Sequence, residues 1–321
     1  MNPSMPGIHH VTAITADAQK NIDFYCGVLG QRLVKLTVNF DDPGSYHLYY
    51  GDDLGRPGSI LTFFAWPGVP RGRAGPPQLT ATSFAAPAGA LEFWARRLKE
   101  HGVEAQGAVT RFGEQVLSFA DPDGMKVEIV ANMQEGVPAP AGGPVPEAYV
   151  LRGFYGVTLS EEGYENTAKL LTDVMGFRTS GSEGHRFRYR ASAGGAASVV
   201  DLLCVPDARR GGTGAGVVHH VAFRTPDDEQ QRAWRERIVR LGYNVSPVMD
   251  RTYFHSIYFR EPGGVLFEVA TDNPGFGADQ DAAELGRSLM LPSWLESQRP
   301  EIEKVLQPLR LPKWQTDPPP A

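Results

Sequence analysis

The chain has 321 residues, 41 % of them hydrophobic, with 36 glycines, 26 prolines and a formal net charge of −6 at pH 7. This length and apolar content suffice for two modest domains or for one body built from repeats, and the many turn-forming residues suit short strands. No basic stretch indicates nucleic acid, and no apolar run of about 18 residues indicates a membrane span, so neither partner is expected. The N-terminus lacks the features of a secretory signal and there are two cysteines only, which together favour a cytoplasmic protein.

One pattern recurs four times along the chain: a strand, an amphipathic helix that ends at a glycine, and shorter strands joined by turns. The first strand of each repeat is predicted at Ile8–Thr15, Leu79–Phe84, Phe154–Ser160 and Val217–Arg224. The helices that follow are expected to end at Gly30, Gly102, Gly176 and Gly242. In the fourth repeat, Thr225 before Pro226 is expected to cap the helix. Each repeat is therefore a β-α-β-β-β module.

The modules divide the chain into two halves. Residues 1–133 hold modules one and two, 134–150 form a linker rich in Pro, Ala and Gly, and 151–276 hold modules three and four. The tail, 277–321, is expected to be an extended and partly helical arm packed on the body or on a partner subunit. A single module would leave one face of its sheet bare, so the modules must pair. The predicted fold class is α+β, with four modules paired into two curled-sheet barrels.

Counting candidate metal ligands indicates which modules pair. The equivalent position on the first strand holds, in chain order, His10, about Ala81, Gly156 and His220. The carboxylate position on the last strand holds Phe63 or Thr62, Glu128, about Asp201, and Glu268. Only pairing module one with module four brings together His10, His220 and Glu268, the two imidazoles and one carboxylate of a metal site with open positions. Modules two and three would then form a metal-free barrel in which Glu128 is structural.

Several neighbours of these ligands are candidates for the surrounding pocket. His9 and His219 precede the two ligands and, by the period of two, point to the opposite face of their strands. Structural hydrogen bonding and a role as ligand support or proton carrier are both open for this pair. Thr12 lies on the same strand face as His10 and would line the pocket.

The fourth module adds further candidates. Tyr258 lies on a strand expected to line the pocket, where its phenol would donate to a bound oxyanion or to dioxygen. Arg251 either neutralises an anionic substrate oxygen or is an exposed turn residue, and His255 is a competing acid or base. The remaining histidines, His47, His101 and His185, are interpreted as surface residues without a role.

The module arrangement over roughly residues 6–272 resembles the vicinal oxygen chelate superfamily, in which paired β-α-β-β-β modules wrap a metal. A closer resemblance is to the ring-cleaving dioxygenases of that superfamily that act on hydroquinones. It rests on Ile8-His9-His10-Val11-Thr12, Gly55-Arg56-Pro57-Gly58-Ser59, His219-His220, Arg260-Glu261-Pro262-Gly263-Gly264-Val265-Leu266-Phe267-Glu268 and Leu291-Pro292-Ser293-Trp294-Leu295-Glu296.

This resemblance implies Fe(II), or alternatively Mn(II), held by His10, His220 and Glu268, with pocket roles for Thr12, His9, His219, Arg251 and Tyr258. It implies a small aromatic diol and O2 as substrates, and a homo-oligomer is expected. Three alternatives are open: a catechol extradiol dioxygenase, a glyoxalase or epimerase, and a non-enzymatic binding protein. Glyoxalases of this fold usually have a fourth, carboxylate-type ligand, and module one offers only Phe63 or Thr62 at that position.

Overall fold

The computed structural model describes residues 4–132 and 142–316 and contains the four repeats. Module one consists of β1 (Ile8–Thr15), α1 (Ala18–Ile22), β2 (Arg32–Asn39), β3 (Asp42–Gly51) and β4 (Ile60–Ala65). Module two consists of β5 (Gln78–Ala86), α2 (Leu91–Glu100), β6 (Ala105–Arg111), β7 (Glu114–Ala120) and β8 (Lys126–Ala131). Module three consists of β9 (Phe154–Glu161), α3 (Glu165–Lys169), β10 (Phe177–Glu183), β11 (Arg186–Ala191) and β12 (Val199–Cys204). Module four consists of β13 (Val218–Thr225), α4 (Asp228–Arg240), β14 (Met249–Asp250), β15 (Phe254–Arg260) and β16 (Leu266–Pro274).

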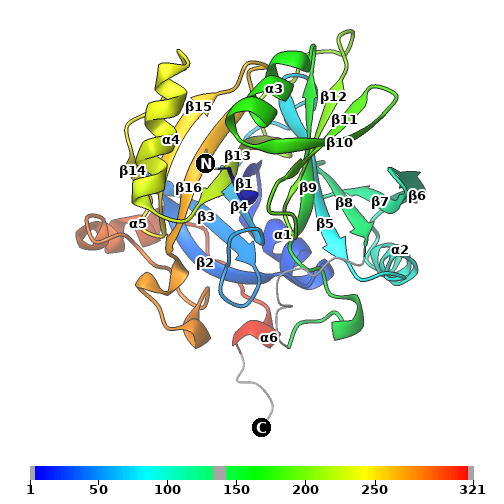
Figure 1. The fold of residues 1–321 in the computed structure, drawn as a ribbon. Helices are drawn as coiled ribbons and strands as arrows, with labels where there is room; N and C mark the ends of the chain where they lie inside the picture. Colours follow the sequence, from blue (N-terminus) through cyan, green and yellow to red (C-terminus); the bar gives the residue numbers. More distant parts are fainter. Residues whose placement is uncertain (1–3, 133–141, 317–321) are drawn as a thin grey trace.

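The strands form two eight-stranded sheets, each built from two modules (Figure 1). Within a module the first strand lies parallel to the last, which leaves the other edge of the first strand open. Unpaired backbone groups on such an edge are satisfied when a second edge joins it. Accordingly β1 pairs antiparallel with β13, and β5 with β9. Module one therefore joins module four, and module two joins module three, which confirms the predicted pairing and fold class.

The helix boundaries follow local signals in the sequence. The four glycines predicted to end helices all have positive φ: Gly30 (69°), Gly102 (72°), Gly176 (78°) and Gly242 (89°). Gly30 and Gly176 follow π-helical turns, Asp23–Val28 and Leu170–Val174, that continue α1 and α3. The predicted cap of the fourth helix is wrong, because Thr225 is the last residue of β13. Asp227 caps α4 instead, and its carboxylate accepts a hydrogen bond from the backbone N–H of Gln230 at 2.9 Å. Trp234 and Ile238 on the inner face of α4 are buried, where the helix contacts β15 and β16 (Figure 1).

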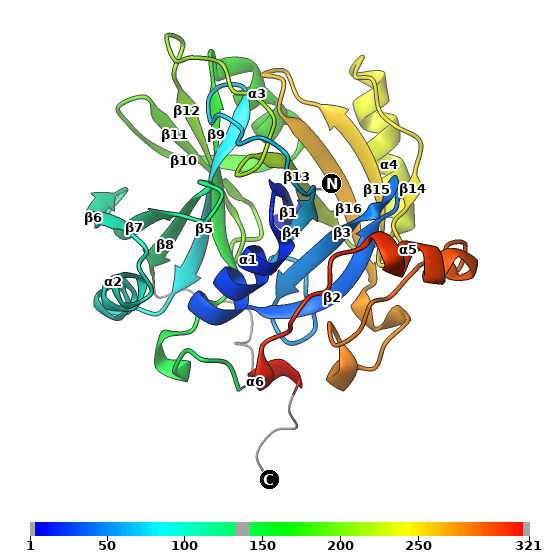
Figure 2. The same cartoon turned by 180° about the vertical axis from the view of Figure 1, so that it is seen from behind.

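After β16 the chain forms an arm that packs on the body of the same chain, beside β2 and β3 (Figure 2). It contains the short helices α5 (Arg299–Val305) and α6 (Lys313–Thr316). Its apolar contacts with β2 form a cluster of Val38, Leu291, Leu295, Ile302 and Leu306. Near its end, the Gln315 side chain accepts a hydrogen bond from the N–H of Leu33 at 3.0 Å and donates one to the carbonyl of the same residue at 2.7 Å. The arm thus covers the strands of module one that are farthest from β13.

Of the predicted linker, residues 142–150 are described and include a short 3-10 turn, Glu147–Tyr149, while 134–141 lie outside the described residues. Across the described ranges 4–132 and 142–316, none of the helices is both long and apolar enough to cross a membrane.

Candidate metal centre

Three neighbouring strands of the first sheet bring the predicted ligands together. His10 comes from β1, His220 from β13 and Glu268 from β16, and all three side chains are buried. Their ligand atoms lie within 4.8 Å of one another, and within the described residues this is the one such group of three. Glu268 Oε2 lies 2.9 Å from His220 Nε2 and 3.3 Å from His10 Nε2. The two Nε2 atoms are 3.3 Å apart.

The trio fits a divalent transition metal. Oε1 of Glu268 accepts a hydrogen bond from Ser256 Oγ at 2.5 Å, but Oε2 is buried without a hydrogen bond of good geometry. A buried carboxylate oxygen is costly unless a cation or a donor satisfies it. Burial lowers the pKa of His220 and so favours the neutral imidazole that a metal requires. Two neutral imidazoles and a carboxylate on one side leave the remaining coordination positions open toward the cavity.

A second histidine supports each ligand. Nδ1 of His9 lies 2.9 Å from Nδ1 of His10, and Nδ1 of His219 lies 2.8 Å from Nδ1 of His220. A ligand that binds through Nε2 carries its hydrogen on Nδ1, so each ligand ring donates to Nδ1 of its neighbour. These contacts fix the orientation of both ligand rings.

The opposite-face placement predicted for His9 and His219 assumed an unbroken strand. In the structure the register between β1 and β13 shifts twice, once between Ile8 and His10 and once opposite His219. Such β-bulges re-aim side chains and interrupt strict alternation. As a result the two extra histidines reach the rings of the adjacent ligands, and neither lines the cavity in front of the trio.

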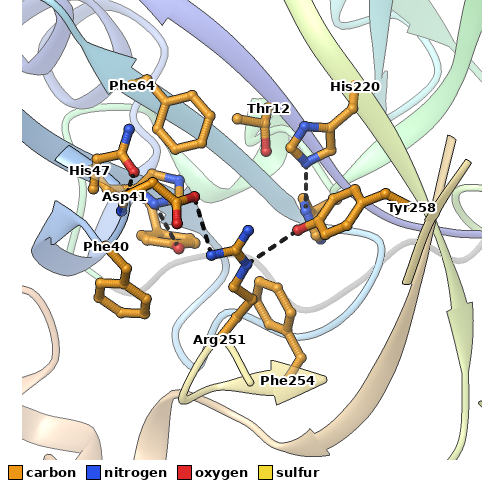
Figure 3. Close-up of a pocket in the computed structure, with 12 residues that line it drawn as sticks. Thr12, Phe40, Asp41, His47, Phe64, His220, Arg251, Phe254 and Tyr258 are labelled. Carbon is orange, nitrogen blue, oxygen red and sulfur yellow. Dashed lines mark hydrogen bonds and ion pairs between the residues drawn. The ribbon is translucent and has the colours of Figure 1, made fainter. Parts of the chain in front are cut away.

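A cavity opens in front of the ligands (Figure 3). It is lined by His10, Thr12, Asn39, Phe40, Asp41, His47, Tyr49, Phe64, His220, Arg251, Phe254 and Tyr258. Two of the predicted pocket residues meet there, since Arg251 Nε lies 3.4 Å from the Tyr258 hydroxyl. Arg251 also pairs with Asp41 at 3.3 Å, and Phe40, Phe64 and Phe254 give the cavity apolar walls. Burial raises the pKa of Tyr258, so its phenol stays a donor.

Two other histidines lie in places that differ from their predicted ones. His47 was interpreted as a surface residue, but it lines the cavity, where its Nε2 lies 2.8 Å from Thr62 Oγ1. His47 shares a strand face with Tyr49, but the sequence does not show that this face of β3 is the one turned toward the cavity. His255 lies outside the cavity and pairs with Asp228 of α4 at 2.6 Å.

In the second barrel, ion pairs occupy the position of the metal ligands. Glu128 pairs with Ser83 on β5 as Glu268 pairs with Ala222 on β13, so the two glutamates are equivalent. Arg111 donates two hydrogen bonds to Glu128, at 2.9 and 3.1 Å. Burial alone would raise the pKa of Glu128, but Arg111 outweighs it and holds the pKa at about 2. In the second barrel a guanidinium thus neutralises Glu128, whereas the equivalent carboxylate of the first barrel, Glu268, faces two imidazoles.

Comparison with known families agrees with this architecture. Residues 7–129 and 157–269 match the glyoxalase/bleomycin resistance protein/dioxygenase superfamily. The chain belongs to this superfamily. MhqO of Bacillus subtilis, provisionally named a ring-cleaving dioxygenase, is 48 % identical over 305 residues, which are 95 % of this chain and 97 % of that protein. The chlorohydroquinone/hydroquinone 1,2-dioxygenase of Sphingobium indicum is 36 % identical over 307 residues, covering 94 % of this chain and 95 % of the relative.

Solved structures extend the comparison of this superfamily member. A crystal structure from Bacillus subtilis, provisionally described as a dioxygenase, has a TM-score of 0.93 at 47 % identity and covers 96 % of this chain and 99 % of its own. Glyoxalase I from Zea mays has a TM-score of 0.61 at 16 % identity, covering 83 % and 92 % of the two chains. The latter similarity concerns the fold alone.

Proposed function

We propose that the chain is a ring-cleaving dioxygenase that uses Fe(II) and O2 to open hydroquinones, the para-diols. One observation carries this proposal: the buried trio of His10, His220 and Glu268 faces a cavity. The guanidinium of Arg251 and the phenol of Tyr258 line the same cavity. The relative named as a hydroquinone 1,2-dioxygenase supports the substrate class, since it is similar along nearly the whole chain. Both atoms of O2 enter the ring-opened product, so the reaction needs no external reductant.

Fe(II) would be held by His10, His220 and Glu268, with Mn(II) as the alternative. When bound, the metal brings the diol and dioxygen together and supplies the redox chemistry that neither substrate can provide alone. The chain contributes the donor set, whose net charge of −1 leaves a divalent ion positive enough to hold a phenolate. His9 and His219 keep the ligand rings oriented through their Nδ1 contacts.

The cavity residues would bind and orient the diol. Tyr258 is a better proton partner than His219 because its ring lines the cavity and lies 5.7 Å from the His220 ring, centroid to centroid, whereas His219 contacts His220 from outside. Arg251 Nε lies beside the same phenol, so its positive charge favours an anionic oxygen next to Tyr258 Oη. Thr12 would contact the diol from the floor of the cavity, and Phe64 and Phe254 would pack against the ring.

A metal-dependent lyase or isomerase is less well supported. Thr62 pairs with Thr12 on β1 and so occupies the position equivalent to Glu268, where a glyoxalase-type fourth carboxylate would be expected. The Thr62 hydroxyl is neutral and is hydrogen-bonded to His47 and Thr12, so it does not replace a fourth carboxylate ligand.

The remaining expectations stay predictions of this proposal. They are the small aromatic diol and O2 as partners, the absence of a nucleic-acid or membrane partner, a homo-oligomer, a cytoplasmic location, and domain boundaries at residues 133, 150 and 276.

The test is oxygen consumption by protein loaded anaerobically with Fe(II), using hydroquinone, methylhydroquinone, chlorohydroquinone and catechol. We expect uptake with the para-diols, matched by a new ring-opened chromophore, and little uptake with catechol. His10→Ala should abolish both uptake and iron retention. Preferential uptake with catechol would move the substrate to ortho-diols, and no uptake by protein shown to hold one iron per chain would refute the dioxygenase.

A further inference from the structure

A chain of four hydrogen-bonded side chains runs along the floor of the cavity. The hydroxyl of Tyr49 lies 2.9 Å from His47 Nδ1, and His47 Nε2 lies 2.8 Å from Thr62 Oγ1. Thr62 Oγ1 in turn lies 3.0 Å from Thr12 Oγ1. Tyr49, Thr62 and Thr12 are buried, and His47 is half-buried. These residues come from three adjacent strands, β3, β4 and β1, so the sheet itself holds the chain in place.

The direction of this chain follows from the partners at its two ends. Among the described residues the Tyr49 hydroxyl has His47 as its one hydrogen-bond partner, so it satisfies its proton by donating to Nδ1. Burial lowers the pKa of His47 well below its usual value, so the ring is neutral. Because Nδ1 accepts from Tyr49, the single ring hydrogen is on Nε2. That N–H donates to Thr62, and Thr62 then donates to Thr12.

At the other end, Thr12 accepts from Thr62, and its own proton meets no acceptor among the residues that the structure describes. Thr12 also lines the cavity in front of the metal ligands. A buried hydroxyl with an unused proton favours an acceptor supplied by a ligand.

We infer that Tyr49, His47 and Thr62 are positioning residues that orient the Thr12 hydroxyl as a hydrogen-bond donor toward an oxygen of the bound diol. This inference rests on the proposed function for the identity of the ligand. The three residues touch Thr12 or one another and act through it. A donor at Thr12 favours the ionised form of the diol, because an oxygen that has lost its proton accepts a hydrogen bond more strongly than a protonated one.

Steady-state oxygen uptake with hydroquinone tests the chain link by link. Thr62→Val keeps the side-chain volume and removes the hydroxyl, so kcat should fall about tenfold to a hundredfold, the effect of one hydrogen bond to a charged oxygen. Thr62→Ser restores the hydroxyl and should recover most of the lost rate. Tyr49→Phe frees His47 to adopt either tautomer and should lower kcat by about tenfold. The matched control is Tyr50→Phe, because Tyr50 is buried next in sequence but donates to Asn21 at 2.8 Å, away from the cavity.

A second readout does not depend on turnover. In metal-free protein carrying ¹⁵N-histidine, the two ring nitrogens of His47 report directly which one is protonated, with His47→Gln used to assign the signal. We expect the proton on Nε2 in the parent and in Tyr50→Phe, and a mixture of tautomers in Tyr49→Phe. A proton on Nδ1 in the parent would overturn the inference.

Equal kcat in Thr62→Val and the parent would also overturn it. Failure of the proposed function has a different signature, namely an iron-loaded parent that takes up no oxygen with any diol while its His47 tautomer is still Nε2–H. In that event the tautomer result alone decides whether the hydrogen-bond chain has the inferred direction.

Discussion

Glu268 and Glu128 provide a matched pair of substitutions, because they occupy equivalent positions in the two barrels and both are fully buried. One carboxylate faces two imidazoles and has an oxygen without a hydrogen bond, whereas the other accepts two hydrogen bonds from Arg111. Glu268→Gln removes the anionic ligand at almost constant volume. We therefore expect it to abolish the stabilisation that a bound metal gives, and Glu128→Gln to leave that stabilisation intact.

The expected shifts in Tm follow from the coupling of metal binding to folding. A metal at a hundred times its Kd that binds only the folded chain raises the free energy of unfolding by about 2.7 kcal/mol. At roughly 2.1 cal/mol/K per residue, the unfolding entropy of this 321-residue chain is about 0.7 kcal/mol/K, so Tm should rise by about 4 °C. Glu268→Gln should show almost no rise. Glu128→Gln leaves the Arg111 guanidinium without its partner and should cost about 3–5 kcal/mol with or without metal.

The assay is thermal unfolding of chelator-treated protein under argon, before and after addition of Fe(II) or Mn(II). Without metal, Glu268→Gln exchanges a buried carboxylate that faces both imidazoles for a neutral amide, so each variant is compared with its own metal-free protein. A full metal-induced rise of Tm in Glu268→Gln, or its loss in Glu128→Gln, would refute the assignment of the ligands.

Three further outcomes are expected. Arg251→Met keeps the side-chain length but removes the charge in the cavity, so kcat/KM for hydroquinone should fall about a hundredfold in an oxygen-electrode assay, and an unchanged value would contradict its role. Burial, with repulsion from Glu261, raises the pKa of Glu161 from 4.5 to about 8; the folded chain holds this proton more tightly than the unfolded chain. The contribution of this carboxyl to the free energy of unfolding should therefore be fully present below pH 4.5 and fall as pH rises to 8, by up to about 1.4 kcal/mol per unit; urea titrations should show the parent losing this contribution relative to Glu161→Gln. Lys35 is buried against Asp279 at 2.6 Å, so Lys35→Met should destabilise the chain by about 1–3 kcal/mol and expose the arm to limited proteolysis, whereas parent-like cleavage would argue against this anchor.

The repeats made the fold and the ligand trio predictable from sequence. Each module carries its own signals of strand, helix end and turn, so the four could be aligned without knowledge of their contacts. In the aligned modules, the positions of side chains that can bind a metal decide which modules pair. Only His10 with His220 and Glu268 gives two imidazoles and a carboxylate. The register in the structure also decides between Thr62 and Phe63 at the remaining position, in favour of Thr62.

What the sequence could not supply depends on interruptions of regular geometry and on contacts between modules. The bulges that turn His9 and His219 toward the ligand rings leave no clear mark in a strand pattern with period two. His47 was missed for another reason. Its strand is one of several that curl around the cavity, and which face of such a strand is concave is decided by the whole sheet and the arm behind it. A histidine that is half-buried at a cavity wall has the same local sequence as one on an outer surface.

The junction of β1 with β13 has a consequence for how the chain is made. His10 and His220 are 210 residues apart, and they become neighbours only when the first and last modules pair. During synthesis on a ribosome, modules one and two emerge first, each with the free edge of its first strand exposed to solvent. The edge of β5 waits only for β9, Phe154–Glu161, whereas the edge of β1 waits for β13, Val218–Thr225, so the nascent first half is a species at risk of wrong strand pairing. Metal binding at the trio must then follow synthesis of module four, because a nascent chain without that module holds His10 and neither His220 nor Glu268.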